Sequence, residues 1–213
     1  MRFSEITEAI ADNVVVFYGG RFQPMHVAHK QVYQHLVQKF DASRVFIATM
    51  VSAKVQGLIA KVDAGGTLTD IQRAEMSKNP FTFDEKANMM STMHGIPTDK
   101  IINTNPYNPD ISKIGMDPNN TAVIVVYSAK DAGRLSPTAY KPYKEGEQLQ
   151  PLAEIQYVYV APEMQGGMSA SDFRNAMKSN ASDQEKAQVF QKFFGKFDKE
   201  VFTFINGRLN ENR

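Results

Sequence analysis

Hydrophobic residues in this chain occur in short continuous runs separated by amphipathic stretches. Residues 14–18 and 121–127 form the two clearest runs, and both are rich in valine and aromatic side chains. Such a run predicts a strand buried on both faces, as in a parallel sheet. Shorter runs predict three more strands, at residues 45–48, 101–102 and 155–160.

Apolar positions three and four residues apart indicate helices between these strands. The spacing predicts helices over residues 4–12, 26–40 and 69–77, from Thr82 or Asp84 to about His94, and from Ser169 to about Arg208. Two polar segments, 103–120 and 128–150, predict loops. Alternating strands and helices predict an α/β, Rossmann-like fold with a five-stranded parallel sheet, flanking helices and a C-terminal helical extension. We expect a short leader over 1–12, one main domain over 13–180, and an extension over 181–213 packed on that domain.

Composition narrows the classes of protein that this chain can be. The 213 residues are 42% hydrophobic, enough for a core without disulfides, and they include no cysteine. Thiolate catalysis and cysteine-ligated metal sites are therefore excluded. The net charge of +1 gives no bulk reason to expect nucleic-acid or membrane binding. The acidic start of the chain and the lack of a long apolar run predict a cytoplasmic protein rather than a secreted or membrane one.

The first candidate site is Gly-Gly-Arg-Phe-Gln-Pro-Met-His-Val-Ala-His at residues 19–29. It lies between a buried strand and a helix, where open α/β sheets bind ligands. Gly19 and Gly20 allow the backbone to approach a ligand closely. His26 and His29, three residues apart, share one face at a helix start, which favours phosphate. The alternative interpretation is two histidines on a partly buried helix face.

A second segment, Lys-Asn-Pro-Phe-Thr at residues 78–82, precedes a helix, although an ordinary turn before a capped helix would look the same. A third runs from Met168 to Arg174 and places Ser169 and Ser171 at a helix start. Serine hydroxyls, free amides and the Arg174 guanidinium could hold one phosphate group there. The alternative is a plain N-cap with a solvated arginine.

Together the three segments resemble the signature motifs of nucleotidylyltransferases, Gly-Arg-Phe-Gln-Pro-X-His-X-Gly-His, Lys-Asn-Pro-Phe-Thr and Ile-Ser-Ser/Ala-Thr-X-X-Arg. The archaeal-type nicotinamide mononucleotide adenylyltransferases are the most similar branch. The resemblance covers roughly residues 13–178. Ala28 stands where the family has glycine, and Lys86 is the nearest equivalent of a family arginine.

The resemblance implies transfer of a nucleoside monophosphate, AMP by preference, from a triphosphate to a phosphate-bearing acceptor such as nicotinamide mononucleotide. Pyrophosphate would leave, and Mg²⁺ would accompany the ATP or CTP. It implies catalytic roles for His26, His29 and Arg174. The implied nucleotide-binding positions are Gly19, Gly20, Arg21, Phe22, Lys78, Ser169, Ser171 and Asp131, of which Asp131 could instead cap a turn.

Three other interpretations stay open. The acceptor could be a sugar- or alcohol-phosphate that receives a cytidylyl group, or a pantetheine phosphate that receives an adenylyl group. Ala28 also allows a non-catalytic nucleotide-binding or structural protein of the same fold. The partners expected are a nucleoside triphosphate and a small phosphorylated acceptor, and a homo-oligomer is compatible with the sequence. The opening residues, with Ile6-Thr7-Glu8, resemble leaders of tailed-phage proteins, which would place the chain in a host cytoplasm or virion.

Overall fold

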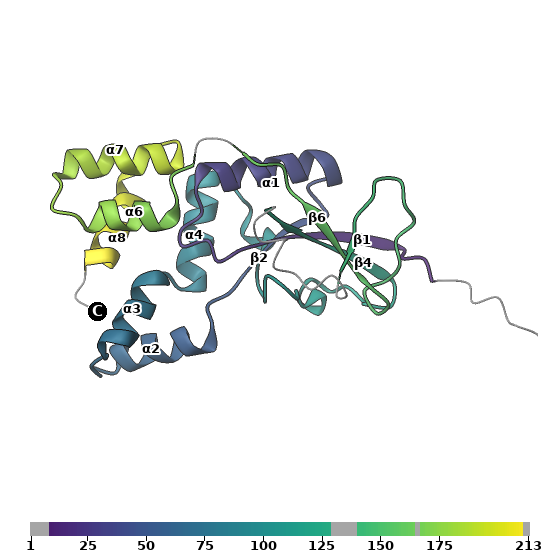
Figure 1. The fold of residues 1–213 in the computed structure, drawn as a ribbon, viewed down its shortest axis with the longest axis horizontal. Helices are drawn as coiled ribbons and strands as arrows, with labels where there is room; N and C mark the ends of the chain where they lie inside the picture. The colour runs from purple at the N-terminus through teal and green to yellow at the C-terminus, as the bar shows by residue number, and fades with distance from the viewer. Residues whose placement is uncertain (1–8, 129–139, 165–166, 211–213) are drawn as a thin grey trace, which may run out of the picture. The chain divides into compact units, whose positions relative to one another are not determined.

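The structure is a computed structural model that describes residues 9–128, 140–164 and 167–210 (Figure 1). Most of the expected helix over 4–12 and the candidate residue Asp131 lie outside these ranges. The described end of the expected helix, residues 9–12, is not helical, so the prediction is wrong there. Ala11 and Asp12 instead donate backbone hydrogen bonds to Leu149 and Asn120.

The strands form one six-stranded sheet in the order β3-β2-β1-β4-β6-β5. Their bounds are β1 Asn13–Gly19, β2 Val45–Thr49, β3 Ile101–Asn103, β4 Thr121–Tyr127, β5 Tyr140–Pro142 and β6 Gln156–Val160. β1 pairs in parallel with β2 and β4, and β6 pairs in parallel with β4 and β5. This arrangement confirms a Rossmann-like α/β fold with a parallel sheet flanked by helices.

The expected number of five strands is wrong, because β5 lies in a segment that the sequence predicts as loop. β5 has three residues, none of them buried, at the edge of the sheet. Its last residue is Pro142, which is tolerated in sheets mainly at edges. A strand this short and exposed leaves no apolar pattern in the sequence. By contrast, every residue of β4 is buried, as its continuous apolar run predicts.

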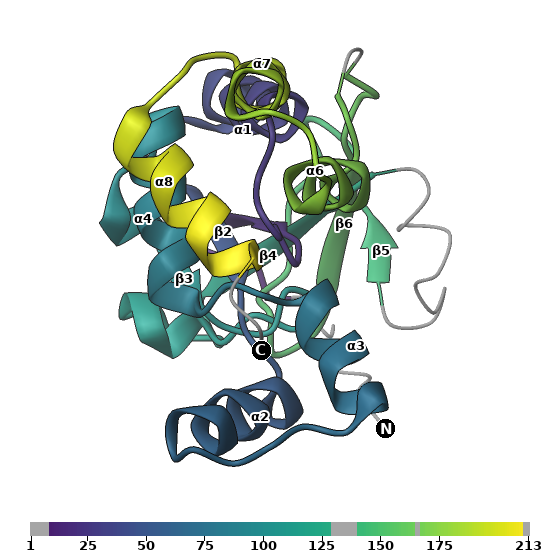
Figure 2. The same ribbon diagram turned by 90° about the vertical axis from the view of Figure 1, so that its left-hand side faces the viewer.

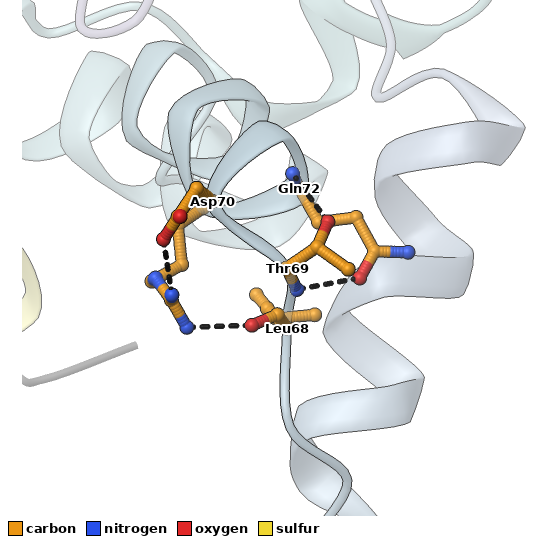
Figure 3. Close-up of polar contacts among 5 residues, drawn as sticks. Leu68, Thr69, Asp70 and Gln72 are labelled. Carbon is orange, nitrogen blue, oxygen red and sulfur yellow. Dashed lines mark hydrogen bonds and ion pairs between the residues drawn. The ribbon is translucent and has the colours of Figure 1, made fainter.

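Seven α-helices and two 3₁₀ turns appear in the described residues. They are α1 Val27–Phe40, α2 Ala53–Asp63, α3 Asp70–Lys78, α4 Phe83–His94, η1 Thr98–Lys100, η2 Ile111–Ile114, α6 Ala170–Lys178, α7 Asp183–Phe194 and α8 Lys199–Asn210. Thr82 caps α4, as expected, through a reciprocal pair of hydrogen bonds with Glu85. Figure 3 shows the same capping box at the start of α3, between Thr69 and Gln72. None of the helices described is long and apolar enough to cross a membrane.

Two helix predictions need correction. α2 was not expected, because Gly57 and a mixed apolar pattern hide its periodicity, yet Ser52 caps it. The expected single helix from Ser169 to about Arg208 is three helices. Ser182 starts α7 with its own capping box, and Gly195, at φ 81°, ends it in the left-handed conformation that glycine adopts without strain.

Contacts divide the chain into two compact units. The first takes in Met1–Gly20, Tyr33–Ala48 and Thr104–Glu163, and it contains β1, β4, β5 and β6. The second takes in Arg21–Val32, Thr49–Asn103 and Met164–Arg213. The second unit therefore contains the first six residues of α1, the helices α2, α3 and α4, and the three C-terminal helices.

Phenylalanine and methionine side chains form the core of the second unit. The cluster joins α4, α6, α7 and α8 and consists of Phe81, Met89, Met93, Phe173, Met177, Phe190, Phe193, Phe194, Val201, Ile205 and Leu209. These rings pack closely, with 4.0 Å between the centroids of Phe173 and Phe193. The tail is therefore a packing element of the second unit.

Replacing Phe190 by alanine should test this core. Phe190 is fully buried and its ring contacts Phe194, with centroids 4.6 Å apart. We expect Phe190→Ala to lower the free energy of unfolding by about 3–5 kcal/mol, because a buried ring is lost and a cavity remains. Urea unfolding followed by circular dichroism measures the change. Ile71→Ala, at a side chain 80% exposed, is the control and should change stability by less than about 0.5 kcal/mol. Equal stabilities for the two variants would contradict the assigned core.

Candidate functional site

The loop before α1 has an unusual backbone at Phe22. Phe22 has φ 44°, in the left-handed region that bulky residues rarely adopt, and its side chain is buried. Its ring meets the His29 ring edge-on, with 5.2 Å between centroids. Strain of this kind persists only where packing fixes it, and it is common at ligand sites. Arg21, the preceding residue, is exposed.

His26 and His29 cap the start of α1 together. The backbone N–H of each donates to Nδ1 of the other, at 3.4 Å in both cases. The rings stack with centroids 3.6 Å apart. Since α1 begins at Val27, this is the reciprocal pattern of a capping box, with imidazole nitrogens as the acceptors. Both Nδ1 atoms accept, so a neutral ring carries its proton on Nε2.

Burial keeps both imidazoles neutral. It lowers the pKa of His26 to about 4, with a smaller contribution from the nearby charge of His94. Burial also lowers the pKa of His29 to about 3, and His26 and then His94 add to the effect. At neutral pH each ring is therefore an uncharged group with one N–H, able to donate a single hydrogen bond through Nε2.

Gln23 joins the three sequence segments singled out above. Its side-chain amide donates to the carbonyl of Phe81 and accepts from the Phe81 N–H, both at 3.1 Å. Its own carbonyl accepts from Nη1 of Arg174 at 2.6 Å. Gln23 and Arg174 are both buried. The segments around residues 23, 81 and 174 are thus held against one another within the second unit, although they are distant in sequence.

The serines of the third segment have different local roles. Ser169 is the N-cap of α6 and accepts from the Asp172 N–H at 3.1 Å. Ser171 instead lies beside Arg174, whose Nη2 donates to its hydroxyl at 3.3 Å. Ser169 is therefore a plain N-cap, as the alternative interpretation holds. The second part of that interpretation, a solvated arginine, is wrong, because Arg174 is only 9% exposed.

Arg21, Arg174 and Lys178 are cations of the second unit, and Arg174 lies close enough to each of the other two for the charges to repel. Burial, and then the charge of Arg21, lower the pKa of Arg174. Burial of the ammonium, and then Arg174, lower the pKa of Lys178. Across the described parts of the chain, none of these three residues forms an ion pair with a carboxylate. A run of cations that no described carboxylate neutralises favours an anionic ligand.

Lys86 anchors the same loop from α4. Its ammonium donates to Thr49 Oγ1 at 2.7 Å and to the carbonyls of Met50 and Arg21 at 3.1 and 3.2 Å. The side chain is fully buried, and burial lowers its pKa to about 7. Three acceptors match the three N–H donors, so Lys86 holds the end of β2 and the Arg21 backbone rather than facing a ligand.

The remaining expected positions are Gly19, Gly20 and Lys78. Gly19 and Gly20 belong to the first unit. A Cβ on Gly19 would come within 2.5 Å of the Pro106 carbonyl, so that glycine is needed for packing. The Gly20 N–H already donates to the Ala48 carbonyl at 3.1 Å. Lys78 is the exposed last residue of α3.

Gly167 covers His26 closely. A Cβ on Gly167 would lie 3.1 Å from Cε1 and Nδ1 of His26 and 3.2 Å from the Ala28 methyl, closer than side chains normally pack. The extra methyl of Ala28 is therefore accommodated by the bare backbone at residue 167. Ala28 itself is buried.

Sequence patterns did not identify Gln23, Lys86, His94 and Gly167 as site residues. His94 is buried at the end of α4, and its Nε2 lies 3.1 Å from the Met25 carbonyl, so it also fixes the loop. Each of these residues acts by contacting a distant backbone segment or side chain. The sequence signal that singles them out is weak: Gln23 belongs to the first motif, and Lys86 was noted only as an arginine equivalent.

Histidine and carboxylate groups do not gather into a metal centre here. Within the described residues, no group of three or more histidine, aspartate or glutamate side chains could hold a metal ion. The donors at the site are imidazoles, a guanidinium and hydroxyls, which suit an anion rather than a bare cation.

Comparison with known proteins gives a likeness of fold. No family model matches the chain, and no curated protein matches it. Solved structures that resemble it include a bifunctional NMN adenylyltransferase/ADP ribose pyrophosphatase from Francisella tularensis, with TM-score 0.52 and 15% identity over 94% of this chain. Another is a Plasmodium falciparum nicotinic acid mononucleotide adenylyltransferase complexed with APC, with TM-score 0.47 and 12% identity, covering 91% of this chain and 94% of that one. The chain spans half the length of the Francisella protein, and what the two share is the α/β fold.

Proposed function

We propose that this protein transfers a nucleoside monophosphate, with AMP the leading candidate, from a nucleoside triphosphate to a phosphate-bearing acceptor and releases pyrophosphate. The observation that carries the proposal is the junction at Gln23, which ties Arg174 to the loop that leads into the stacked imidazoles of His26 and His29. Neutral N–H donors, together with cations that pair with no carboxylate among the described residues, form an environment suited to phosphate groups.

The reaction needs no nucleophilic side chain. An oxygen of the acceptor phosphate attacks the α-phosphorus of the triphosphate in line and forms the new P–O bond. The bond from the α-phosphorus to the bridging oxygen breaks, and pyrophosphate leaves with that oxygen. Catalysis is then positioning together with stabilisation of the charge that builds on the phosphoryl oxygens.

The site residues take separate parts in this scheme. We assign Nε2–H of His26 to the α-phosphate and Nε2–H of His29 to the phosphates of the nucleotide. Arg174 and Ser171 would hold the pyrophosphate end, where the guanidinium also keeps its hydrogen bond to the Gln23 carbonyl. Because the Gly20 amide is already used in the sheet, the backbone donors for the α-phosphate would be those of Arg21 and Phe22.

Lys78 and Ser169 have supporting roles in the proposed reaction. Lys78 is exposed and free to reach the acceptor, whereas Ser169 contributes through the helix start that it caps. Mg²⁺ would arrive with the triphosphate as part of the substrate, held by phosphate oxygens and water. We derive no step through a protein-bound metal, because the described residues offer no ligand cluster for one.

A panel of triphosphates and acceptors tests the activity. ATP and CTP would each be combined with nicotinamide mononucleotide, pantetheine phosphate, and sugar- and alcohol-phosphates, and pyrophosphate release would be measured. We expect release with ATP and nicotinamide mononucleotide. Release only with CTP and a sugar- or alcohol-phosphate would support the cytidylyl alternative. Nucleotide binding without release from any pair would contradict an enzyme and favour the non-catalytic alternative that Ala28 motivates.

Two substitutions separate the capping and catalytic roles of the histidines. His26→Asn keeps an N-cap acceptor, and His29→Gln keeps a residue that completes a capping box, but both remove the imidazole N–H. We expect each variant to fold with near wild-type stability and to lose turnover about 10²-fold or more, as expected for a lost transition-state donor. Pyrophosphate release and thermal melting measure the two effects.

The matched control for these variants is His35→Gln. His35 lies in the first unit, where its Nε2 is 3.0 Å from the Tyr159 hydroxyl, and its turnover should stay at the wild-type level. Wild-type turnover in both His26→Asn and His29→Gln would exclude the phosphate role of the imidazoles and leave them as a helix cap.

Stability should fall in acid because of the same two residues. In the unfolded chain both titrate near about 6.5, whereas in the folded protein their pKa values are about 4 and about 3. Between the folded and unfolded pKa values the unfolded chain binds more protons than the folded protein does, so lowering the pH through this range lowers the free energy of unfolding. Above about pH 6.5 both states are neutral at these histidines, and the destabilisation is absent. Urea midpoints at several pH values from 7.5 to 4.5 should therefore fall less for a His26→Asn, His29→Gln double variant than for wild type. Parallel profiles for the two proteins would show that the histidines are not buried as neutral rings.

A further inference from the structure

The second unit contains a pocket whose lining includes none of the residues assigned above to the nucleotide. Its lining comes from α3, α6 and α8, which Figure 2 shows in blue, green and yellow, and from the residue Pro80. The polar side chains that line it are Arg73, Ser77, Lys178 and Arg208, and the walls include Met76 and Leu209. Three of the lining side chains are cationic and none is acidic.

Two of the three cationic side chains of the pocket are paired with carboxylates, and the third, Lys178, is not paired with a described carboxylate. Arg73 forms an ion pair with Asp70, which is labelled in Figure 3 at the start of α3. Arg208 forms an ion pair with Glu85, with 2.5 Å between Nη2 and Oε1. Lys178 has no carboxylate partner among the described residues, and its ammonium donates to the Ser77 hydroxyl at 2.6 Å. A serine hydroxyl is uncharged, so it accepts a hydrogen bond from the ammonium without neutralising it, and the positive charge can still attract a ligand.

Lys178 also lies next to the site already described. Arg174 and Lys178 are four residues apart on α6, so they share a face of the helix, and the charge of Arg174 lowers the pKa of Lys178. Two like charges held together in this way raise the free energy of the empty protein. A bound anion would relieve that repulsion, which makes the pocket a better anion site than a lone surface lysine.

The donors in the pocket match the oxygens of a phosphate group. The ammonium of Lys178 and the hydroxyl of Ser77 lie together, and the guanidinium groups of Arg73 and Arg208 line the same space, where each is already paired with a carboxylate and adds positive charge at longer range. The apolar side chains of Met76 and Leu209 leave room for a small organic group on the phosphate rather than demanding a bare ion. We propose that the pocket between α3, α6 and α8 binds a phosphate group, with Lys178 as its principal contact.

The phosphate could come from two sources. It could be the terminal phosphate of the nucleoside triphosphate bound at the histidines, or a separate inorganic phosphate or phosphomonoester. The proposal concerns binding, and it does not require that the protein transfer a nucleotide. Phosphate binding and pyrophosphate release are measured separately, so failure of one proposal is distinguishable from failure of the other.

Calorimetric titration of the full chain with inorganic phosphate tests the pocket. Lys178→Met should weaken phosphate binding by 10-fold or more, because it removes the charge and keeps most of the unbranched side chain. Lys192→Met, at an exposed lysine of α7 that does not line the pocket, is the matched control and should bind phosphate as wild type does. Equal dissociation constants for wild type and Lys178→Met would overturn the proposal, as would loss of binding in His29→Gln but not in Lys178→Met.

A second titration, with the protein saturated by a non-hydrolysable ATP analogue, distinguishes the sources. Phosphate that still binds with an unchanged dissociation constant would show a separate site for phosphate or a phosphomonoester. Phosphate that is displaced, together with weaker analogue binding by Lys178→Met than by Lys192→Met, would show that the pocket receives the end of the triphosphate. Displacement of phosphate with equal analogue binding by both variants would count against the pocket as the binding site.

Discussion

The hydrogen bonds of Gln23 are the constraint on which the rest of the second unit depends. One side chain satisfies both main-chain groups of Phe81, and one carbonyl receives Arg174. All of these groups are buried, where an unpaired polar group costs about 1–3 kcal/mol. Losing any partner would leave others unsatisfied, so the three segments are held as a unit. The position of the guanidinium relative to the imidazoles follows from this arrangement rather than from the motif residues alone.

The two histidines show how one arrangement can serve both folding and chemistry. Their Nδ1 atoms accept the N–H groups that a helix start leaves open, and this use fixes the proton of each neutral ring on Nε2. Burial prevents the charging that would break the cap. The ring nitrogen that carries the N–H is therefore defined by the helix start itself. A structural interpretation of the pair and a catalytic one are compatible, since they concern opposite sides of the rings.

The sequence predicts the parts of this protein in which local pattern and environment agree. Continuous apolar runs locate β1 and β4, and Thr82 locates the start of α4. β5 and α2 were not predicted because neither has a clear apolar period. The C-terminal tail is divided at Ser182 and Gly195, which begin and end α7 and interrupt an otherwise continuous apolar face. For the site, the motifs indicate which segments matter. They do not show that Lys86 is enclosed or that Gln23 is the junction, because those roles depend on hydrogen-bond partners 36 to 151 residues away.

The close approach of Gly167 to Ala28 links two positions that the chain keeps far apart. A Cβ on residue 167 would meet the His26 ring at 3.1 Å and the methyl of residue 28 at 3.2 Å, so a side chain there would have to displace both neighbours. Proteins that share this packing should therefore keep glycine at residue 167 for as long as they keep the histidine. An alanine in the histidine motif strengthens the same requirement, because its methyl is a second group that a larger residue at position 167 would meet.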